Sequence, residues 1–263
     1  MLRALYTGAS GMQAQQTNLD TIANNLANSS TTGFRSSRMQ FQDLIYQNVI
    51  MPGAAASQQT TVDAGLQIGL GTRSAASEIL QAQGDLSATG NQLDLAIEGN
   101  GFFQVLLPSG ELAYTRAGSF HTDATGNVVT ANGNPIQPAL NIPQNSTSVN
   151  IAADGTVSVT LPGQAASQQV GSIQLALFPN AGGLSSNGGN LFTPTTASGD
   201  AVVGTPGGTD GLGSIEQGYL EQSNVSVVDE FINMIVAQRS YEASSRVVQA
   251  ADQMLQLINN LGH

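Results

Sequence analysis

The C-terminal stretch from Val228 to Asn260 carries the pattern that most constrains how this chain can fold. Apolar and small residues follow one another there at alternating spacings of three and four, the a/d spacing of a heptad repeat on a long helix. This stripe consists of Met234, Ala237, Tyr241, Ser244, Val248, Ala251, Leu255 and Ile258. A second row of Val247, Met254 and Leu261 widens the apolar face. At ~1.5 Å per residue the helix would be roughly 50 Å long, so it needs a partner along its length.

The N-terminus offers one such partner. A matching set of apolar residues recurs there every seven positions, with two more residues between them, and consists of Leu5, Met12, Leu19, Leu26, Ile22 and Ala23. The pattern predicts an amphipathic helix of about 25 residues, which Gly33 is expected to stop. Two interpretations stay open at this point: the helices close one monomeric fold, or they pack between subunits.

The segment that follows Phe34 has no clear period. It carries Met39, Phe41, Leu44 and Ile45 in a short mixed region that could continue as helix. From Asn48 to Gly65 the chain is rich in Ala, Ser, Gln and Thr and contains Pro52, which predicts an extended linker. Long stretches of this kind are uncommon in compact domains and are often functional.

The middle of the chain alternates with period two, as β-strands do. Leu93, Leu95 and Ile97 alternate with polar or small residues, which indicates a half-buried strand. Further along, Asp154-Gly155 separates two alternating runs, a strong signal for a β-hairpin. The run from Asn180 to Gly213 is dominated by Gly, Ser, Asn, Thr and Pro, and is expected to form loops with short edge strands.

The sequence therefore predicts an α+β fold in which long N- and C-terminal helices pair as a coiled-coil-like domain, with an all-β domain inserted between them. The expected ranges are residues 1–45 and 221–263 for the two parts of the helical domain, 46–65 for an extended segment, and 66–220 for the β-rich domain.

Composition excludes several classes of function. Eighteen acidic residues against seven basic ones give a net charge of −11, which argues against nucleic-acid binding because that requires a basic surface. No apolar run approaches the ~18–20 residues of a membrane span. The first residues lack the apolar core and the cleavage site of a secretory signal peptide. The chain has no cysteine and only two histidines, so we expect no disulfide and no metal site.

One short stretch has the residue types of a catalytic triad. Ser119, His121 and Asp123 would share one face of a strand, but neighbouring positions do not give the geometry of nucleophile, base and orienting acid. The stretch from Asp123 to Asn127 also resembles part of a calcium loop, although the later acidic ligand is missing. A turn explains it better. We expect no catalytic residue, no cofactor and no metal, and hence no enzyme.

Three stretches resemble the flagellar rod and hook protein family. The first is ALYTGASGMQAQQTNLDTIANNLANSSTTGFRSSRMQFQDL at the N-terminus, with ANNLAN followed by TTGFR. The second comprises DLAIEGNGFFQV and YTRAGSFHTDATGNVVTANGNPI in the middle, and the third is GYLEQSNVSVVDEFINMIVAQRSYEASSRVVQAADQMLQLINNL near the C-terminus. The likeness covers essentially the whole chain and is specific, because the motifs fall in the right order.

The resemblance implies a structural axial subunit that polymerises into a hollow helical tube and passes motor torque to the hook. It implies export through the flagellar type III apparatus without a cleavable signal, a place in the basal body across the periplasm, and contacts with other rod proteins, hook or hook-junction proteins and surrounding ring proteins. The expected assembly interface comprises Leu5, Met12, Leu19, Ile22, Leu26, Met234, Tyr241, Val248, Ala251, Leu255 and Ile258.

The stretch YQNVIMPGAAASQQTTVDAG resembles an extra segment that marks one branch of the family. The resemblance implies that it braces adjacent subunits and keeps the rod straight, through positions that include Tyr46, Pro52, Gly53, Gln58, Thr61 and Gly65. A proximal rod subunit of the same family is the nearest alternative, and it should lack this segment. A secreted β-rich binding module with helical ends is the alternative from a different class of protein.

Overall fold

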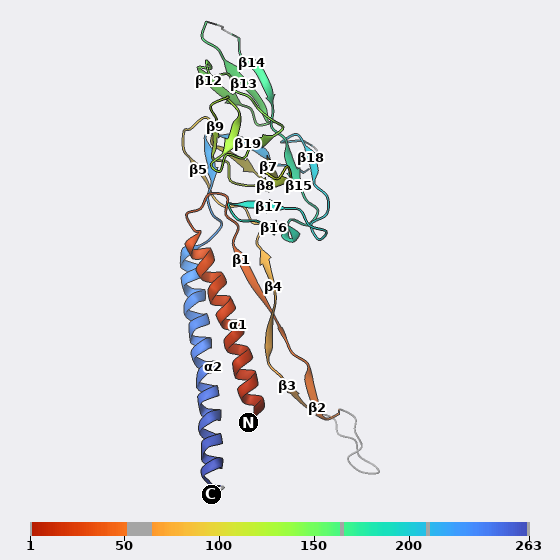
Figure 1. Ribbon diagram of the computed structural model, residues 1–263, viewed down its shortest axis with the longest axis vertical. Helices are drawn as coiled ribbons and strands as arrows, with labels where there is room; N and C mark the ends of the chain where they lie inside the picture. Colours follow the sequence, from red (N-terminus) through yellow and green to blue (C-terminus); the bar gives the residue numbers. More distant parts are fainter. Residues whose placement is uncertain (1, 52–64, 164–165, 209–210, 262–263) are drawn as a thin grey trace. The chain divides into compact units, whose positions relative to one another are not determined.

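The computed structural model describes residues 2–51, 65–163, 166–208 and 211–261. It has one long helix at each end and a β-rich middle, so the predicted α+β class is confirmed (Figure 1). The chain separates into two compact units. Unit 1 comprises residues 1–27, 37–78 and 226–263, and unit 2 comprises residues 28–36 and 79–225.

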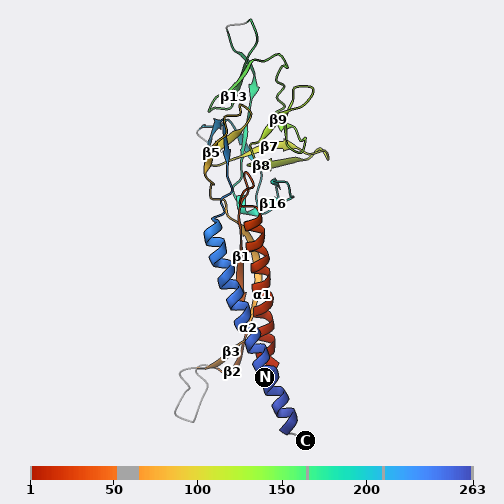
Figure 2. The ribbon, with the colours of Figure 1, turned by 90° about the vertical axis from the view of Figure 1, so that its left-hand side faces the viewer.

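The helices α1 (Leu2–Ala27) and α2 (Val227–Leu261) form the larger part of unit 1. They lie side by side and run in opposite directions (Figures 1 and 2). α2 begins where the side chain of Ser226 accepts a hydrogen bond from the backbone N–H of Asp229, as an N-cap residue does. Asp229 and Glu230 in the first turn place negative charge at the positive end of the helix dipole.

The rest of unit 1 is a long antiparallel hairpin, which we call the ribbon. Each of its two sides consists of two successive strands. β1 (Ser37–Asp43) pairs with β4 (Thr72–Ile79), whose last residue falls in unit 2, and β2 (Tyr46–Ile50) pairs with β3 (Leu66–Gly69). The expectation of continuing helix after Phe34 was wrong, as was that of a linker at 48–50. Residues 46–50 form a strand because they pair with β3, which begins only at Leu66. A pattern within residues 46–50 alone does not reveal this partner.

Unit 2 is built from short antiparallel strands. Its largest sheet has the order β16-β17-β8-β7-β15-β18, with β11 paired to β7, and β12, β13 and β14 form a second sheet. The remaining described strands pair two by two as β9 with β10, β6 with β19 and β5 with β20. The bounds are β5 Leu86–Ala88, β6 Leu95–Glu98, β7 Phe102–Leu106, β8 Leu112–Thr115, β9 Phe120–Thr122, β10 Val128–Thr130, β11 Ile136–Gln137, β12 Ser148–Ile151, β13 Thr156–Thr160, β14 Gln168–Ser172, β15 Leu175–Leu177, β16 Ser185–Ser186, β17 Leu191–Thr193, β18 Val202–Gly204, β19 Ser214–Gln217 and β20 Tyr219–Glu221, with a 3-10 turn, η1, at Ala181–Gly183.

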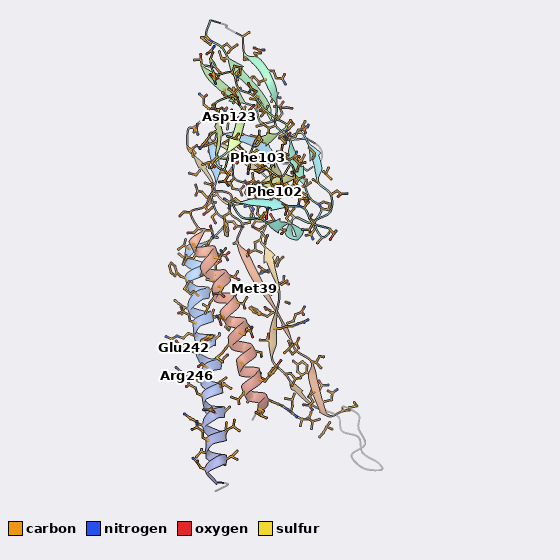
Figure 3. The ribbon with its side chains drawn as sticks, viewed as in Figure 1. Met39, Phe102, Phe103, Asp123, Glu242 and Arg246 are labelled. Carbon is orange, nitrogen blue, oxygen red and sulfur yellow. The ribbon has the colours of Figure 1, made fainter. Side chains whose placement is uncertain are left out.

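Among the described residues, the buried apolar side chains of unit 2 form three clusters, the largest of which contains Phe103. Phe102 and Phe103 lie inside unit 2 (Figure 3). Phe103 is fully buried and packs edge-on against Phe120 with ring centroids 5.2 Å apart, while Phe102 packs in a second cluster with Phe178. The hairpin predicted at Asp154-Gly155 is confirmed as the β12–β13 connection. There the backbone N–H of Thr156 bonds to the Asp154 carboxylate.

The strand predicted around Leu95 is more buried than its alternation indicated. Leu95, Ala96 and Ile97 are all buried, on both faces of β6. One edge of the strand pairs with β19, and the backbone N–H of Leu95 bonds to the carbonyl of Gly118 on the other. β6 is therefore covered on both faces, and the small side chain of Ala96 is buried on the face opposite that of Leu95 and Ile97.

The two units divide the chain differently from the ranges expected from sequence. The residues from 37 to 78 belong with the helices rather than with the β-rich unit, and residues 28–36 belong with the β-rich unit. Unit 2 ends at residue 225, just before α2 begins. The division into ranges with separate functional roles stays a prediction.

Candidate functional site

The heptad stripe of α2 lies on the side of the helix that is covered within the chain. Ala237 and Ala251 are buried, and Met234, Val248 and Leu255 are half-buried. Tyr241 and Ile258 are the members of the predicted set on α2 that stay exposed, at 39% and 52%. α1 covers this side over the part of α2 that it lies beside (Figures 1 and 2).

The predicted residues of α1 complete this packing. Ile22 is buried, and the other four are half-buried, namely Leu5, Met12, Leu19 and Leu26. Sequence reasoning missed the glycines between them. A methyl group on Gly8 would lie 2.7 Å from Cγ2 of Val248, and one on Gly11 would lie 3.3 Å from Oγ of Ser244. Small residues at these two positions let the helices approach closely.

A buried asparagine connects the end of α1 and the start of α2 to the ribbon. Asn25 donates from Nδ2 to the carbonyl of Ser37 and to Oε1 of Glu230, both at 2.8 Å. Its Oδ1 accepts the backbone N–H of Ser37 at 2.9 Å. One side chain thus joins the last turn of α1, the first turn of α2 and the start of β1. The ANNLAN motif contains this residue, but the sequence gives no sign of its partners.

The first turns of α2 carry a second apolar surface. Ile235 is 57% exposed although it lies only two residues from buried Ala237, since two residues turn an α-helix by roughly 200°. Other large exposed residues share this side. We call them the outer patch, which consists of Val228, Phe231, Ile232, Ile235 and Val236.

Charged and polar residues follow the outer patch along the helix, and apolar residues return at its end. Glu242 and Arg246 project from the side of α2 away from α1 (Figure 3), and Arg239 pairs with Glu242 at 3.0 Å. α2 then continues past the N-terminus of α1 (Figures 1 and 2). The exposed apolar residues of this end, which we call the tip, are Met254, Leu257 and Ile258.

The ribbon is also apolar on its surface. Its exposed large residues include Ile45, Tyr46, Val49, Ile50, Met51 and Leu66. The ring of Tyr46 lies over Gly69, where a side chain would come within 3.3 Å of Cε1. Of the predicted bracing residues, Tyr46 is half exposed and Gly65 is half-buried. The others, Pro52, Gly53, Gln58 and Thr61, lie outside the described residues.

A groove of about 550 Å³ opens between the two helices and β3. Ala4, Gly8, Ile68 and Val247 give it a largely apolar lining, with Arg3 at its edge. The groove and the outer patch both leave apolar surface of unit 1 uncovered. Monomeric proteins rarely leave contiguous apolar surface of this kind exposed unless another molecule covers it.

The candidate catalytic stretch is occupied by turn hydrogen bonds. Oδ1 of Asp123 accepts from the hydroxyl and the backbone N–H of Thr125 and from the backbone N–H of Asn127. These bonds, led by the Thr125 hydroxyl, lower the pKa of Asp123 to about 2. The Nδ1 atom of His121 lies 2.6 Å from the carbonyl oxygen of Phe120. Asp123 is therefore an ionised turn residue.

The described part of the chain contains no group of three or more histidine, aspartate and glutamate side chains arranged to hold a metal ion. Within the same residues no helix is long and apolar enough to cross a membrane.

Comparison with known proteins gives family matches in three parts of the chain. Residues 5–35 match the family described as flagella basal body rod protein, residues 96–159 match the flagellar hook protein FlgE/F/G D1 domain, and residues 216–261 match the C-terminal part of the flagellar basal body rod FlgEFG proteins.

Full-length relatives agree with these matches. The chain is 48% identical to the flagellar basal-body rod protein FlgG of Buchnera aphidicola subsp. Acyrthosiphon pisum, over 99% of this chain and 100% of the relative. It is 47% identical to the protein of that name in Caulobacter vibrioides and 40% identical to that in Bacillus subtilis, in both cases over 99% of each chain.

Proposed function

Because this chain belongs to the flagellar basal-body rod protein family and is a structural subunit of the flagellar rod, we propose that it polymerises into the hollow distal rod and transmits motor torque to the hook. The observation that carries this proposal is the uncovered apolar surface of unit 1. Copies of the chain that cover this surface would complete a unit that is incomplete in the single molecule. Head-to-tail contacts that do not close into a ring generate an open helical filament.

The outer patch supplies the main contact in this proposal. Its five residues are large, apolar and adjacent on one face of a rigid helix. Burial of apolar surface is worth ~25 cal/mol per Å², so several such side chains per subunit supply a substantial driving force. The charged residues between the outer patch and the tip, such as Arg239 and Glu242, would fix the register of neighbouring helices.

The heptad stripe has a second role in the proposal. Its covered members hold α1 and α2 together as a coiled-coil-like pair, while exposed Tyr241 and Ile258 extend the assembly surface around α2. In the filament, neighbouring pairs would pack together as the inner wall and unit 2 would form the outer layer. The a/d set from Leu5 to Ile258 thus acts both within and between subunits.

The ribbon is proposed to brace adjacent subunits and keep the rod straight. A two-stranded ribbon is marginally stable by itself, and its exposed Tyr46, Ile50 and Leu66 gain most when a neighbouring copy covers them. The presence of the extra segment favours a distal over a proximal rod subunit. Unchanged bending stiffness of the polymer after deletion of residues 48–61, seen in electron micrographs, would count against this role.

The place of the protein follows from its family, whose members belong to the flagellar basal body. We extend this to a position across the periplasm, reached by type III export without a cleavable signal. Other rod proteins, hook or hook-junction proteins and surrounding ring proteins are the proposed partners. The role is structural rather than enzymatic. A secreted β-rich binding module is disfavoured, because it gives no reason for the exposed outer patch.

Polymerisation of surface variants tests the proposal. We expect Ile232→Asp and Ile235→Asp to raise the protein concentration needed for filaments by about 10- to 100-fold, because a carboxylate would be desolvated at the contact. Ser167→Asp is the matched control, since it adds the same charge at an exposed polar position of unit 2, which has no part in the outer patch. Circular dichroism checks that the dilute variants keep their helices. Filaments from both isoleucine variants at the wild-type concentration would overturn the proposal.

A further inference from the structure

A buried cluster of charged side chains in unit 2 has no part in the assembly surface. Arg35, Arg116 and Glu221 are 3%, 4% and 1% exposed. Nη1 of Arg35 lies 2.6 Å from Oε1 of Glu221, and Nη1 of Arg116 lies 3.2 Å from Oε2 of the same carboxylate. Two buried guanidinium groups therefore share one buried carboxylate.

Glu221 also holds two other parts of the backbone. Its Oε1 accepts the backbone N–H of Gly84 at 3.0 Å, and its carbonyl accepts the backbone N–H of Gly33 at 2.8 Å. Gly33 has a φ of +67°, and a side chain on it would come within 2.5 Å of the backbone nitrogen of Ala117. Gly33 of the TTGFR motif is therefore required, because the chain passes close to the backbone just after β8. Arg35 of the same motif forms the ion pair with Glu221.

These contacts lie where the chain enters and leaves unit 2. The chain crosses between units after residues 27, 36, 78 and 225. We call residues 28–36, 79–84 and 221–225 the crossing segments. Residues 28–36 contain no strand, so isolated backbone bonds such as that from Leu80 to the carbonyl of Ser36, together with side-chain contacts, hold them in place. Glu221 belongs to the last of these segments and contacts the other two, and Asn224 adds bonds to the backbone of Ser36, Leu80 and Ala82.

The charge balance makes Glu221 the critical member of the cluster. Burial lowers the pKa of Arg116 to about 10, while the Glu221 carboxylate acts in the opposite direction. Arg116 also donates to the carbonyls of Ile97 and Gly99 and lies over the ring of Phe102. Nε and Nη2 of Arg35 and Nε of Arg116 are buried without a hydrogen-bond partner among the described residues. Without Glu221, two buried positive charges would face each other.

We propose that Glu221 clamps the crossing segments of unit 2, by serving as the shared counter-charge of Arg35 and Arg116 and as the acceptor for Gly84. The clamp is a property of the single chain and does not depend on polymerisation. In a subunit that carries torque, as proposed above, it would keep the chain from peeling away from unit 2 at the points where force enters.

Hydrogen–deuterium exchange of the full-length protein, below the concentration at which it polymerises, tests the clamp. We expect Glu221→Gln to speed amide exchange in all three crossing segments by about 100-fold or more, because breaking a buried charge cluster leaves both guanidiniums uncompensated. The β12–β14 sheet should keep its wild-type exchange. Glu216→Gln is the matched control, a half-exposed glutamate on the neighbouring strand β19, and should change nothing.

Arg35→Gln separates a clamp from general loss of stability. It leaves one arginine paired with one glutamate, so we expect about 10-fold faster exchange confined to residues 28–36. If Glu221→Gln unfolds the whole of unit 2, a confined response of Arg35→Gln still supports the clamp. The proposal is overturned if Glu221→Gln behaves like Glu216→Gln, or if Arg35→Gln speeds exchange evenly across unit 2.

Discussion

The two units of this chain treat their large apolar side chains in opposite ways. In unit 2, Phe103, Phe120, Leu95 and Ile97 are at most 1% exposed, in a core that the unit closes by itself. In unit 1, large apolar residues of α2 and the ribbon are often half exposed or more. Unit 2 buries its large apolar side chains within the single chain. Unit 1 carries similar side chains, but two helices and a ribbon are too few elements to cover them.

The difference follows from how each element can be covered. Short strands of unit 2 stack into sheets whose inner faces meet, so each apolar side chain finds partners within about 150 residues of chain. A pair of helices buries only the stripe along which they touch. The outer patch lies on the other side of α2 from that stripe, and the tip lies beyond the N-terminus of α1, so α1 covers neither (Figures 1 and 2).

Replacing one phenylalanine in each unit is the strongest test of this contrast. We expect Phe103→Ala to destabilise unit 2 by about 3–5 kcal/mol, because it removes a fully buried ring and leaves a cavity beside Phe120. Phe231→Ala should cost under about 1 kcal/mol in the dilute protein, since the ring of Phe231 is 49% exposed. Denaturant unfolding, monitored by hydrogen exchange within each unit, measures the change in the free energy of unfolding for both variants.

The same pair should reverse its order in the polymer. Phe231→Ala weakens filament formation although it hardly changes the dilute protein, while Phe103→Ala leaves the outer patch intact. Equal losses of stability from the two substitutions in the dilute protein would mean that unit 1 closes its own core, and the contrast between the units would be wrong.

Much of this contrast could be predicted from the sequence, but not all. The heptads from Leu5 to Leu26 and from Met234 to Ile258 located both helices, because a repeat of that length has few other readings. The outer patch was not predicted, because α2 is apolar on two sides in its first turns and only one of these sides continues as a long heptad repeat. Periodicity records that a face is apolar without recording which partner covers it.

The ribbon and the charge cluster could not be predicted for a different reason. β1 pairs with β4 across a long stretch of sequence, and no local signal relates the two. Arg35, Arg116 and Glu221 are likewise far apart in sequence and share no spacing. By contrast, the hairpin at Asp154-Gly155 was predicted correctly, because its two strands are neighbours and the turn residues are diagnostic.

Alanine substitutions at two glycines of α1 test how closely α1 packs against the heptad stripe of α2. Alanine gains roughly 1 kcal/mol over glycine inside a helix. At Gly8 the added methyl would meet Cγ2 of Val248 at 2.7 Å, and overpacking costs about 1–3 kcal/mol, so we expect a net loss of about 1 kcal/mol. At Gly11 the contact is the rotatable hydroxyl of Ser244 at 3.3 Å, and we expect Gly11→Ala to be neutral or slightly stabilising.

The thermal midpoint of helix loss, followed by circular dichroism, compares the two glycine variants. Gly8→Ala combined with Val248→Ala should lose less stability than the two single changes added together, since the clash is gone. If Gly8→Ala and Gly11→Ala raise stability equally, the helices are not in close contact at Gly8, and even the buried stripe of unit 1 would be loose.

The smallest expected effect concerns a surface turn of unit 2, and it asks whether that unit is well ordered at its edges as well as in its core. Hydrogen bonds from Thr125 and Asn127 lower the pKa of Asp123 from 3.8 to about 2. A carboxyl group whose pKa is depressed in the folded state adds stability above its unfolded pKa and loses it as the pH falls through the folded pKa. The turn should therefore hold from neutral pH down to about pH 4 and loosen towards pH 2.

NMR titration of the Asp123 carboxyl group measures this pKa. Thr125→Ala should move the pKa back towards 3.8, because it removes the hydrogen bond that contributes most to the shift. Thr122→Ala is the control, since Thr122 is exposed beside the turn and donates no bond to Asp123 among those described. An unchanged midpoint in Thr125→Ala would mean that the turn is not held by these bonds, and that the order of unit 2 stops at its core.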